Sequence, residues 1–204
     1  MPRQPLIRSE HLPYHVTQRS NNKEWFYLSL DEIWEISTEA LSKAKKETGA
    51  RIHAFVLMNN HYHLLISTPE ANLDAFQWSF ANTFTREVKR RSGRINHIFG
   101  GRYKWSLIRE KNYLYQAYKY IYLNPVRAKI VEKAEDYPFS TLSTRTIEID
   151  DPLEQEHSKS QIINWINQSF KPQQAAGLRR SLRYREFKAL VDPVNRKSLS
   201  YSTP

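Results

Sequence analysis

The chain of 204 residues contains no cysteine. Disulfides, thiolate metal sites and cysteine nucleophiles are therefore excluded, and the absence fits a reducing compartment. The N-terminal segment lacks the apolar core of a secretory signal, and no run approaches the ~18 apolar residues of a membrane-spanning helix. We therefore expect a cytoplasmic protein with no membrane partner.

Positive charge is abundant and is unevenly placed along the chain. The formal net charge is +10, which favours a polyanionic partner. Nine Lys and Arg face two acids in residues 86–111, and eight face two acids in residues 171–197. Between these blocks, residues 146–157 hold five acids and no Lys or Arg. Two basic blocks separated by an acidic spacer favour nucleic-acid contact over an ordinary solvated surface.

Two segments carry the residue types from which we infer chemistry. His61 and His63 lie in the apolar run AFVLMNNHYHLLIS. In a strand, residues two apart point to the same side, so both imidazoles share one face. In a helix, residues four apart lie one above the other, so Tyr120 and Asn124 share a face. Two imidazoles and an amide oxygen can hold a divalent cation, and a tyrosine beside it can attack a phosphate.

The same residues have simpler explanations. An isolated pair such as His61 and His63 is often no more than two polar residues on a half-exposed strand. Asn124 could instead close the preceding helix before Pro125. Tyr118 is a second candidate for the nucleophile, although we expect its stripe of the helix to pack in the core.

The order of the predicted elements indicates an α+β fold. Patterning predicts strands at 14–19, 51–58, 61–68 and 105–109, a turn at 21–23, and helices at 30–48, 72–91 and from Asn112, a candidate cap, to about Leu123. This order is the ferredoxin-like β-α-β-β-α-β pattern followed by a tyrosine-bearing helix, which predicts an antiparallel sheet with two helices on one face. Pro125 should prevent continuation of the tyrosine helix. Amphipathic segments 161–170 and 173–190 predict a helical C-terminal appendage.

Five motifs in a fixed order resemble one known family. They read HVTQRSNN from His15, FVLMNNHYHLL from Phe55, FGGRYKWSLI from Phe99, YIYLNPVRA from Tyr120 and DYPFSTL from Asp136. Together they resemble the HUH single-tyrosine transposases, and within them the REP-associated tyrosine transposases of the IS200-like branch. The resemblance covers roughly residues 11–143. We therefore expect a transposase domain at 1–143 and an acidic linker with a basic helical appendage at 144–204.

The resemblance implies a role for each candidate residue. Tyr120 would be the nucleophile of a DNA nicking and joining enzyme, and His61, His63 and Asn124 would hold Mg²⁺ or Mn²⁺. The implied reaction is cleavage and rejoining of single-stranded DNA at hairpin-forming palindromic repeats through a 5′-phosphotyrosine, as in transposition and recombination. The expected partner is single-stranded or hairpin DNA, bound by a monomer or homodimer.

Two other functions remain open. A non-catalytic protein that binds hairpin DNA or RNA could share this fold. A metal-dependent nuclease using activated water would need a general base, and neither motif holds a carboxylate.

The candidate DNA-binding residues are Arg19, Arg102, Lys104 and Trp105. Arginine matches phosphate geometry and can read guanine edges. Trp105 alternates with the cations and could stack on an unpaired base, or it could belong to the core.

Overall fold

The sheet of this computed structural model, which describes residues 5–144, 146–188, 191–192, 194 and 197–204, is antiparallel with the strand order β2-β3-β1-β4. Its core elements are β1 (Tyr14–Arg19), α1 (Leu30–Thr48), β2 (Arg51–Met58), β3 (His61–Ser67), α2 (Leu73–Ser92) and β4 (Lys104–Leu107). The α+β fold and the β-α-β-β-α-β order predicted from the sequence are thereby confirmed. The predicted boundaries differ by two residues at most, and the turn expected after β1 is a short 3-10 helix, Asn21–Lys23.

Local signals explain where the two long helices begin and end. Ser29 and Glu32 form a reciprocal capping box at the start of α1. Gly49 and Gly93 follow α1 and α2 with φ of +66° and +70°, a backbone conformation that glycine adopts without strain. Both helix ends therefore follow from residues visible in the sequence.

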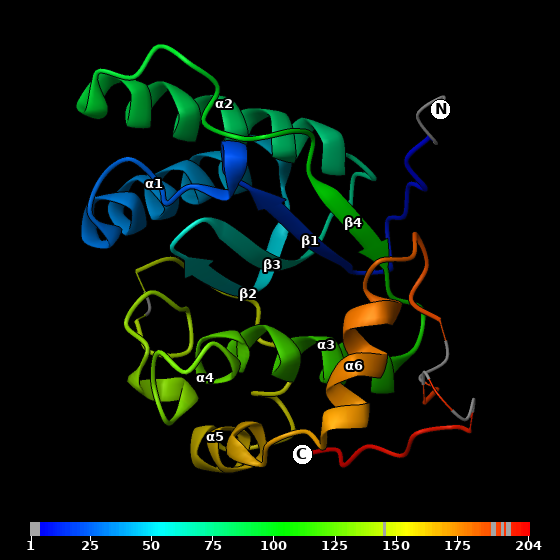
Figure 1. Cartoon of the computed structure of the whole chain (residues 1–204). Coiled ribbons are helices and arrows are strands. Elements are labelled where there is room, and N and C mark those ends of the chain that lie inside the picture. The colour runs from blue at the N-terminus through cyan, green and yellow to red at the C-terminus, as the bar shows by residue number, and fades with distance from the viewer. Residues whose placement is uncertain (1–4, 145, 189–190, 193, 195–196) are drawn as a thin grey trace.

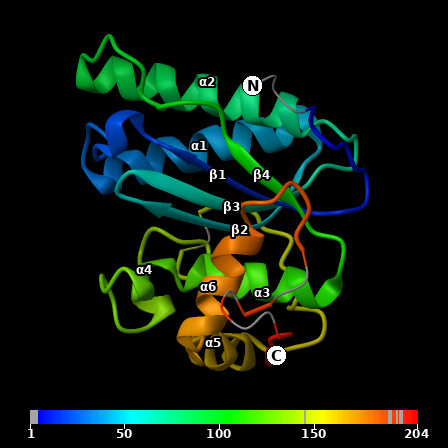
Figure 2. The same ribbon diagram turned by 45° about the vertical axis from the view of Figure 1, so that its right-hand side comes forward.

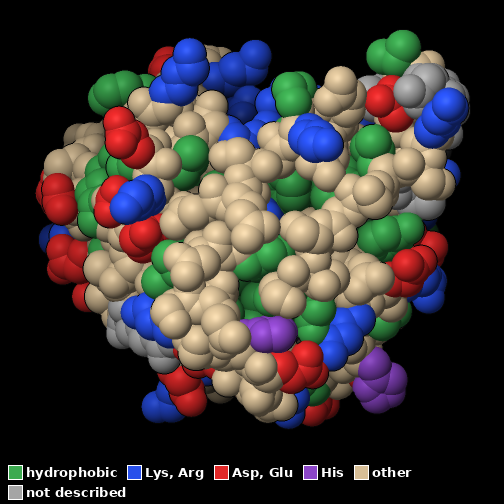
Figure 3. Space-filling model, turned by 90° about the horizontal axis from the view of Figure 1, so that it is seen from below, with side chains coloured by type: hydrophobic (Ala, Val, Ile, Leu, Met, Phe, Trp, Pro, Cys, Tyr) green, Lys and Arg blue, Asp and Glu red, His purple; other side chains and the backbone are tan. Residues whose placement is uncertain are grey.

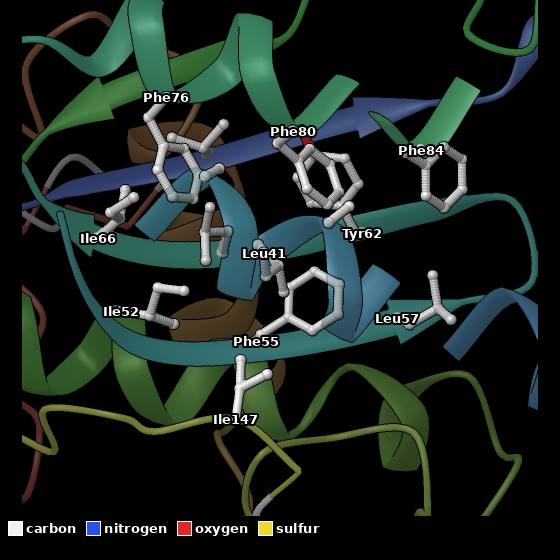
Figure 4. Close-up of a cluster of buried hydrophobic side chains, with 14 of the residues drawn as sticks. Leu41, Ile52, Phe55, Leu57, Tyr62, Ile66, Phe76, Phe80, Phe84 and Ile147 are labelled. Carbon is white, nitrogen blue, oxygen red and sulfur yellow. The ribbon is translucent and has the colours of Figure 1, made fainter. Parts of the chain in front are cut away.

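The helices α1 and α2 cover one face of the sheet, above it in Figure 1. Alternation along β3 sends Tyr62, Leu64 and Ile66 toward these helices. Their core, which we call the α1/α2 core, also contains Leu41, Ile52, Phe55, Phe76, Phe80 and Phe84 (Figure 4). Phe80 packs edge-on against Tyr62 with ring centroids 5.2 Å apart. This face is mainly apolar and aromatic, and it also buries Gln18 and Gln77 beside the Tyr62 hydroxyl.

The opposite face of the sheet is covered by α3 (Lys111–Tyr122), below the strands in Figures 1 and 2. The N-cap of α3 is Glu110, so the prediction that Asn112 caps this helix is wrong. Pro125 does not continue α3, which ends at Tyr122, so the prediction for Pro125 is confirmed. It lies in the first turn of a further short helix, α4 (Asn124–Arg127), where a missing N–H leaves no bond unmade.

The C-terminal helices pack beneath α3. They are α5 (Lys159–Asn167) and α6 (Pro172–Ser181), so α6 ends earlier than the predicted segment 173–190, whose last two residues lie outside the described residues. One buried cluster, which we call the α3 core, joins them to the sheet; it includes Val56, Leu65, Tyr118, Ile121, Leu153, Ile162, Trp165, Ile166, Leu178 and Phe187. The division of the chain at residue 143 stays a prediction, but residues from both sides of it share this cluster.

Both edges of the sheet are covered by later segments of the chain. The DYPFSTL motif runs along β2, where Leu57 N donates to Phe139 O and Thr141 N donates to Phe55 O, each at 3.0 Å. On the other edge, Leu107 N donates to Arg185 O at 2.8 Å, and Phe187 N donates to Leu107 O at 2.7 Å. Covered edges have few unpaired backbone groups with which another strand could pair.

The face of the molecule seen from below carries charges of both signs. Acidic and basic side chains are interspersed around the rim of the face seen from below (Figure 3).

None of the helices in the described part of the chain has the length and apolar character needed to cross a bilayer.

Candidate active site

His61 and His63 point from β3 toward α3, with ring centroids 5.1 Å apart. The Nδ1 of His61 donates to Asn60 Oδ1 at 2.7 Å. The side-chain nitrogen Nδ2 of Asn60 donates to Lys23 O at 2.7 Å, so the side-chain oxygen of Asn60 faces His61. With Nδ1 of His61 engaged, its Nε2 keeps a lone pair for a ligand. Burial, and then the charge of Arg19, lowers the pKa of His61 to about 4, so this ring is neutral at pH 7.

His63 is held by a third histidine that sequence reasoning missed. His15 lies in β1 at 2% exposure, and its Nε2 is 2.9 Å from Nδ1 of His63, with the two rings stacked. Burial lowers the pKa of His15 to about 3. Burial first, and then neighbouring positive charge, holds the pKa of His63 well below its usual value. The two rings are thus neutral, and one donates to the other.

The pairing of the strands explains this contact. β1 runs antiparallel to β3, with His15 opposite Leu65 and Thr17 opposite His63. His15 therefore lies diagonally next to His63 on the same face. This contact could have been predicted from the sequence. The ferredoxin-like order makes β1 and β3 neighbours, and alternation places His15 on the opposite face from Tyr14 and Val16.

Tyr120 faces the histidines from α3. Its ring stands edge-on to His63 with centroids 6.1 Å apart, and the side chain is 6% exposed. Tyr118, the second candidate, lies elsewhere: its hydroxyl donates to Asp151 Oδ2 at 2.6 Å and its ring packs against Tyr122. The structure therefore brings Tyr120, and not Tyr118, to the histidine pair.

Asn124 closes the end of α3 through its side-chain nitrogen. Its Nδ2 donates to Tyr120 O at 2.9 Å and to Ile121 O at 3.2 Å, which closes the end of α3. Within the described residues its Oδ1 has no hydrogen bond. Since capping uses the amide nitrogen, the oxygen stays available as a ligand.

The donor set suits a divalent cation of the kind predicted. The described residues hold no group of three or more His, Cys, Asp or Glu side chains placed to bind a metal ion. The predicted set is of a different kind, with two imidazole nitrogens whose partner nitrogens are already hydrogen-bonded, and one amide oxygen. Fixing the second nitrogen of a ligating histidine orients the ring and selects its tautomer.

The candidate DNA-binding residues divide between the two faces. In the strand register, Arg19 lies opposite His61 and Lys104 lies opposite Thr17. The side chains of Arg19 and Lys104 are therefore on the histidine face, and both are exposed. Trp105 alternates to the other face, where its half-buried ring meets Tyr14 edge-on with centroids 6.2 Å apart.

Arg102 precedes β4 and is exposed, with its guanidinium 5.4 Å from the centroid of the Tyr103 ring. Gly100 positions this segment: a side chain there would approach Ser20 O at 3.0 Å. The FGGRYKWSLI motif thus places two of its cations at the surface.

Comparison with known proteins agrees with the motifs. No family model matches the chain. A REP-associated tyrosine transposase of Escherichia coli (strain K12) is 29% identical over 113 residues, which span 53% of this chain and 64% of that protein. The alignment thus covers less than two thirds of the relative.

A solved structure shares this fold. A REP-associated tyrosine transposase bound to a REP hairpin superposes with a TM-score of 0.56 at 22% identity, covering 69% of this chain and 82% of that one. A transposase-like protein from Deinococcus radiodurans R1 gives a TM-score of 0.38 at 15% identity, covering 64% and 91%. The resemblance to the REP-associated tyrosine transposases is confirmed in sequence and in fold.

Proposed function

We propose that this chain, which resembles the REP-associated tyrosine transposases, is a metal-dependent transesterase that cleaves and rejoins single-stranded DNA at hairpin-forming repeats. The observation that carries the proposal is the position of Tyr120, edge-on to His63 at the end of a helix closed by Asn124. The fold neighbour bound to a REP hairpin supports hairpin DNA as the partner. The alternative is a protein of the same fold that binds hairpins without cutting them.

Three atoms would hold the cation: Nε2 of His61, Nε2 of His63 and Oδ1 of Asn124. Bound Mg²⁺ or Mn²⁺ would polarise the scissile phosphate and neutralise part of its charge. Asn60 and His15 orient the two imidazoles by their hydrogen bonds. With the proton of His63 on Nδ1, directed at His15, Nε2 presents its lone pair to the ligand.

Tyr120 would attack the phosphorus through its phenolic oxygen. A bond forms between this oxygen and phosphorus, and the bond from phosphorus to the 3′ oxygen breaks. The phenol gives its proton to water, and the departing oxygen takes one from water to become a 3′-hydroxyl. The 5′-phosphotyrosine keeps the energy of the ester, so a 3′-hydroxyl can attack it and rejoin the strand.

Arg19 and Lys104 would contact the DNA backbone beside the reacting phosphate. Both are exposed on the face that holds the histidines. Lysine and arginine neutralise phosphates and release counterions, so binding should weaken steeply with salt.

The test is formation of a covalent protein–DNA adduct with labelled hairpin DNA that carries a single-stranded flank, in the presence of Mn²⁺ or Mg²⁺. Wild type should give an adduct that survives denaturing electrophoresis, and chelation should prevent it. Tyr120→Phe should form none while binding the hairpin normally, because only the attacking oxygen is removed. Tyr118→Phe is the matched control on the same helix and should still form the adduct.

Two results would contradict the proposal. An adduct formed by Tyr120→Phe would exclude Tyr120 as the nucleophile. Hairpin binding by wild type with no adduct under any metal would favour the non-catalytic alternative.

A further inference from the structure

Arg127, the last residue of α4, places a positive charge directly at Tyr120. Its guanidinium carbon lies 4.6 Å from the centroid of the Tyr120 ring. Its Nη1 atom is buried and has no hydrogen-bond partner among the described residues. No carboxylate of the described chain forms an ion pair with it. Buried guanidinium nitrogens are normally hydrogen-bonded, so this one requires an explanation.

The charge of Arg127 also reaches the histidine pair. The Tyr120 ring, over which the Arg127 guanidinium lies, stands edge-on to His63 with centroids 6.1 Å apart. Arg127 is therefore close both to the tyrosine and to the histidine that faces it. An unpaired donor and a positive charge at this place suit an anion that enters the site from outside.

The backbone, and not the side chain, holds Arg127 in position. Its N–H donates to Leu123 O at 2.9 Å, and the turn that follows is closed by Ile130 N donating to Pro125 O at 3.0 Å. The guanidinium itself forms no hydrogen bond within the described residues. A substitution that keeps the length of the side chain should therefore leave α4 intact.

We propose that Arg127 is a further catalytic residue whose guanidinium binds a non-bridging oxygen of the phosphate that Tyr120 attacks. This inference rests on the proposed function. The guanidinium presents several N–H donors in a planar fork, which matches a phosphate better than a point charge does. Charge on the non-bridging oxygens must be stabilised while the bond to Tyr120 forms and the bond to the 3′ oxygen breaks, and a fixed cation does this without reorganisation.

The alternative is that Arg127 only holds the Tyr120 ring by a cation–π contact. The two roles differ in what they require of the DNA. If Arg127 only holds the ring, its effect on the rate does not depend on the charge of the phosphate. If Arg127 binds the phosphate, its effect on the rate depends on that charge. A methylphosphonate at the scissile position replaces one charged oxygen by a methyl group and therefore separates them.

The experiment measures the rate of adduct formation by wild type, Arg127→Met and Arg127→Lys on a hairpin with a normal scissile phosphate and on one with a methylphosphonate there. On the normal substrate, Arg127→Met should be slower by about 10²-fold or more, as for other lost donors to a reacting oxyanion. Arg127→Lys should recover part of the rate. On the methylphosphonate, the ratio of wild type to Arg127→Met should shrink by about tenfold or more. Lys43→Met, an exposed change on α1 across the sheet, is the control and should match wild type.

Each outcome decides the inference. Equal rates for wild type and Arg127→Met on the normal substrate, or the same ratio on both substrates, would overturn the role of Arg127 and leave the proposed function standing. Failure of wild type to form any adduct would overturn both. Thermal melting and hairpin binding of each variant, unchanged from wild type, show that a slow rate does not come from misfolding.

Discussion

The two faces of one sheet differ in what they bury. Toward α1 and α2 the buried side chains are mainly aliphatic and aromatic, with rings packed on rings (Figure 4), and the polar exceptions include Gln18 and Gln77 beside the Tyr62 hydroxyl. Toward α3 the sheet buries polar groups as well: His15 and His63 from the strands, and Gln116, Lys119 and Tyr120 from the helix. Alternation along β1 and β3 separates the two sets residue by residue.

The difference indicates that the α1/α2 face mainly stabilises the fold, whereas the α3 face carries the candidate active-site residues. Burying a polar group costs free energy unless its hydrogen bonds are replaced. On the α3 face the replacement is partial, since Gln116 Oε1 and Arg127 Nη1 have no partner among the described residues, and the α1/α2 face has such a group as well, Gln77 Nε2. The α3 face therefore needs neighbouring apolar contacts to offset the free-energy cost of burying polar groups, and the C-terminal helices supply these contacts.

Truncation after residue 143 should have the largest effect on the fold. It removes Leu153, Ile162, Trp165, Ile166, Leu178, Leu182 and Phe187 from the α3 core, together with the segment that covers β4. Each large apolar side chain lost from a core costs about 2–5 kcal/mol, and the whole stability of a domain is about 5–15 kcal/mol. We therefore expect the 1–143 fragment to lose cooperative unfolding and near-UV circular dichroism.

Adding the 144–204 segment as a separate polypeptide is the control and should restore both signals. A 1–143 fragment that unfolds cooperatively would instead support the two-part division expected from the sequence. In that case the α3 core would be a contact between separable units.

A paired substitution should separate the two faces. Phe80→Ala, in the α1/α2 core, should lower the free energy of unfolding by about 3–5 kcal/mol and leave cleavage per folded molecule unchanged. His61→Leu, at a half-buried site, should change stability by about 1 kcal/mol or less and abolish metal-dependent cleavage. Urea melts and adduct formation on the same preparations measure both quantities. Normal cleavage by His61→Leu would exclude His61 from the site.

Much of the fold could be predicted because its signals are local. Capping residues, glycines with positive φ and alternation along β3 fix α1, α2 and the orientation of His61 and His63. The pair of Tyr120 and Asn124 follows from helical spacing alone. The error at Asn112 also has a local cause, because a residue that favours the cap position can lie in the first turn when another residue takes the cap.

What the sequence did not predict depends on contacts between distant segments. The hydrogen bond between His15 and His63 joins residues 48 positions apart, and the edge contacts of β4 come from residues 185–187. The C-terminal segment lacks motifs, so its share of the α3 core could not be recognised from composition. Arg127 was read as part of a motif, and its place over the Tyr120 ring comes from the turn between α3 and α4.

Lys119→Met should have a smaller effect, and one of the opposite sign. Lys119 is 2% exposed, and its ammonium lies 4.8 Å from the centroid of the Trp165 ring and 5.2 Å from that of Phe170. Burial lowers its pKa from 10.5 to about 8, so at pH 7 the folded protein carries a buried charge at a cost. Cation–π contacts offset part of that cost. We expect Lys119→Met to raise the free energy of unfolding at pH 7 by about 1–2 kcal/mol.

The pH dependence gives the sign of this effect independently. Because the folded-state pKa of Lys119 is the lower one, the unfolded chain binds more protons between pH 8 and 10.5, and wild-type stability contributed by this group rises across that range. The advantage of Lys119→Met should therefore be constant below pH 8 and shrink toward pH 10.5. Lys43→Met, an exposed change on α1, should shift stability by about 0.5 kcal/mol or less at every pH. If Lys119→Met is instead less stable than wild type at pH 7, the two aromatic rings hold the ammonium as a net favourable contact, and burial of this charge does not destabilise the α3 face.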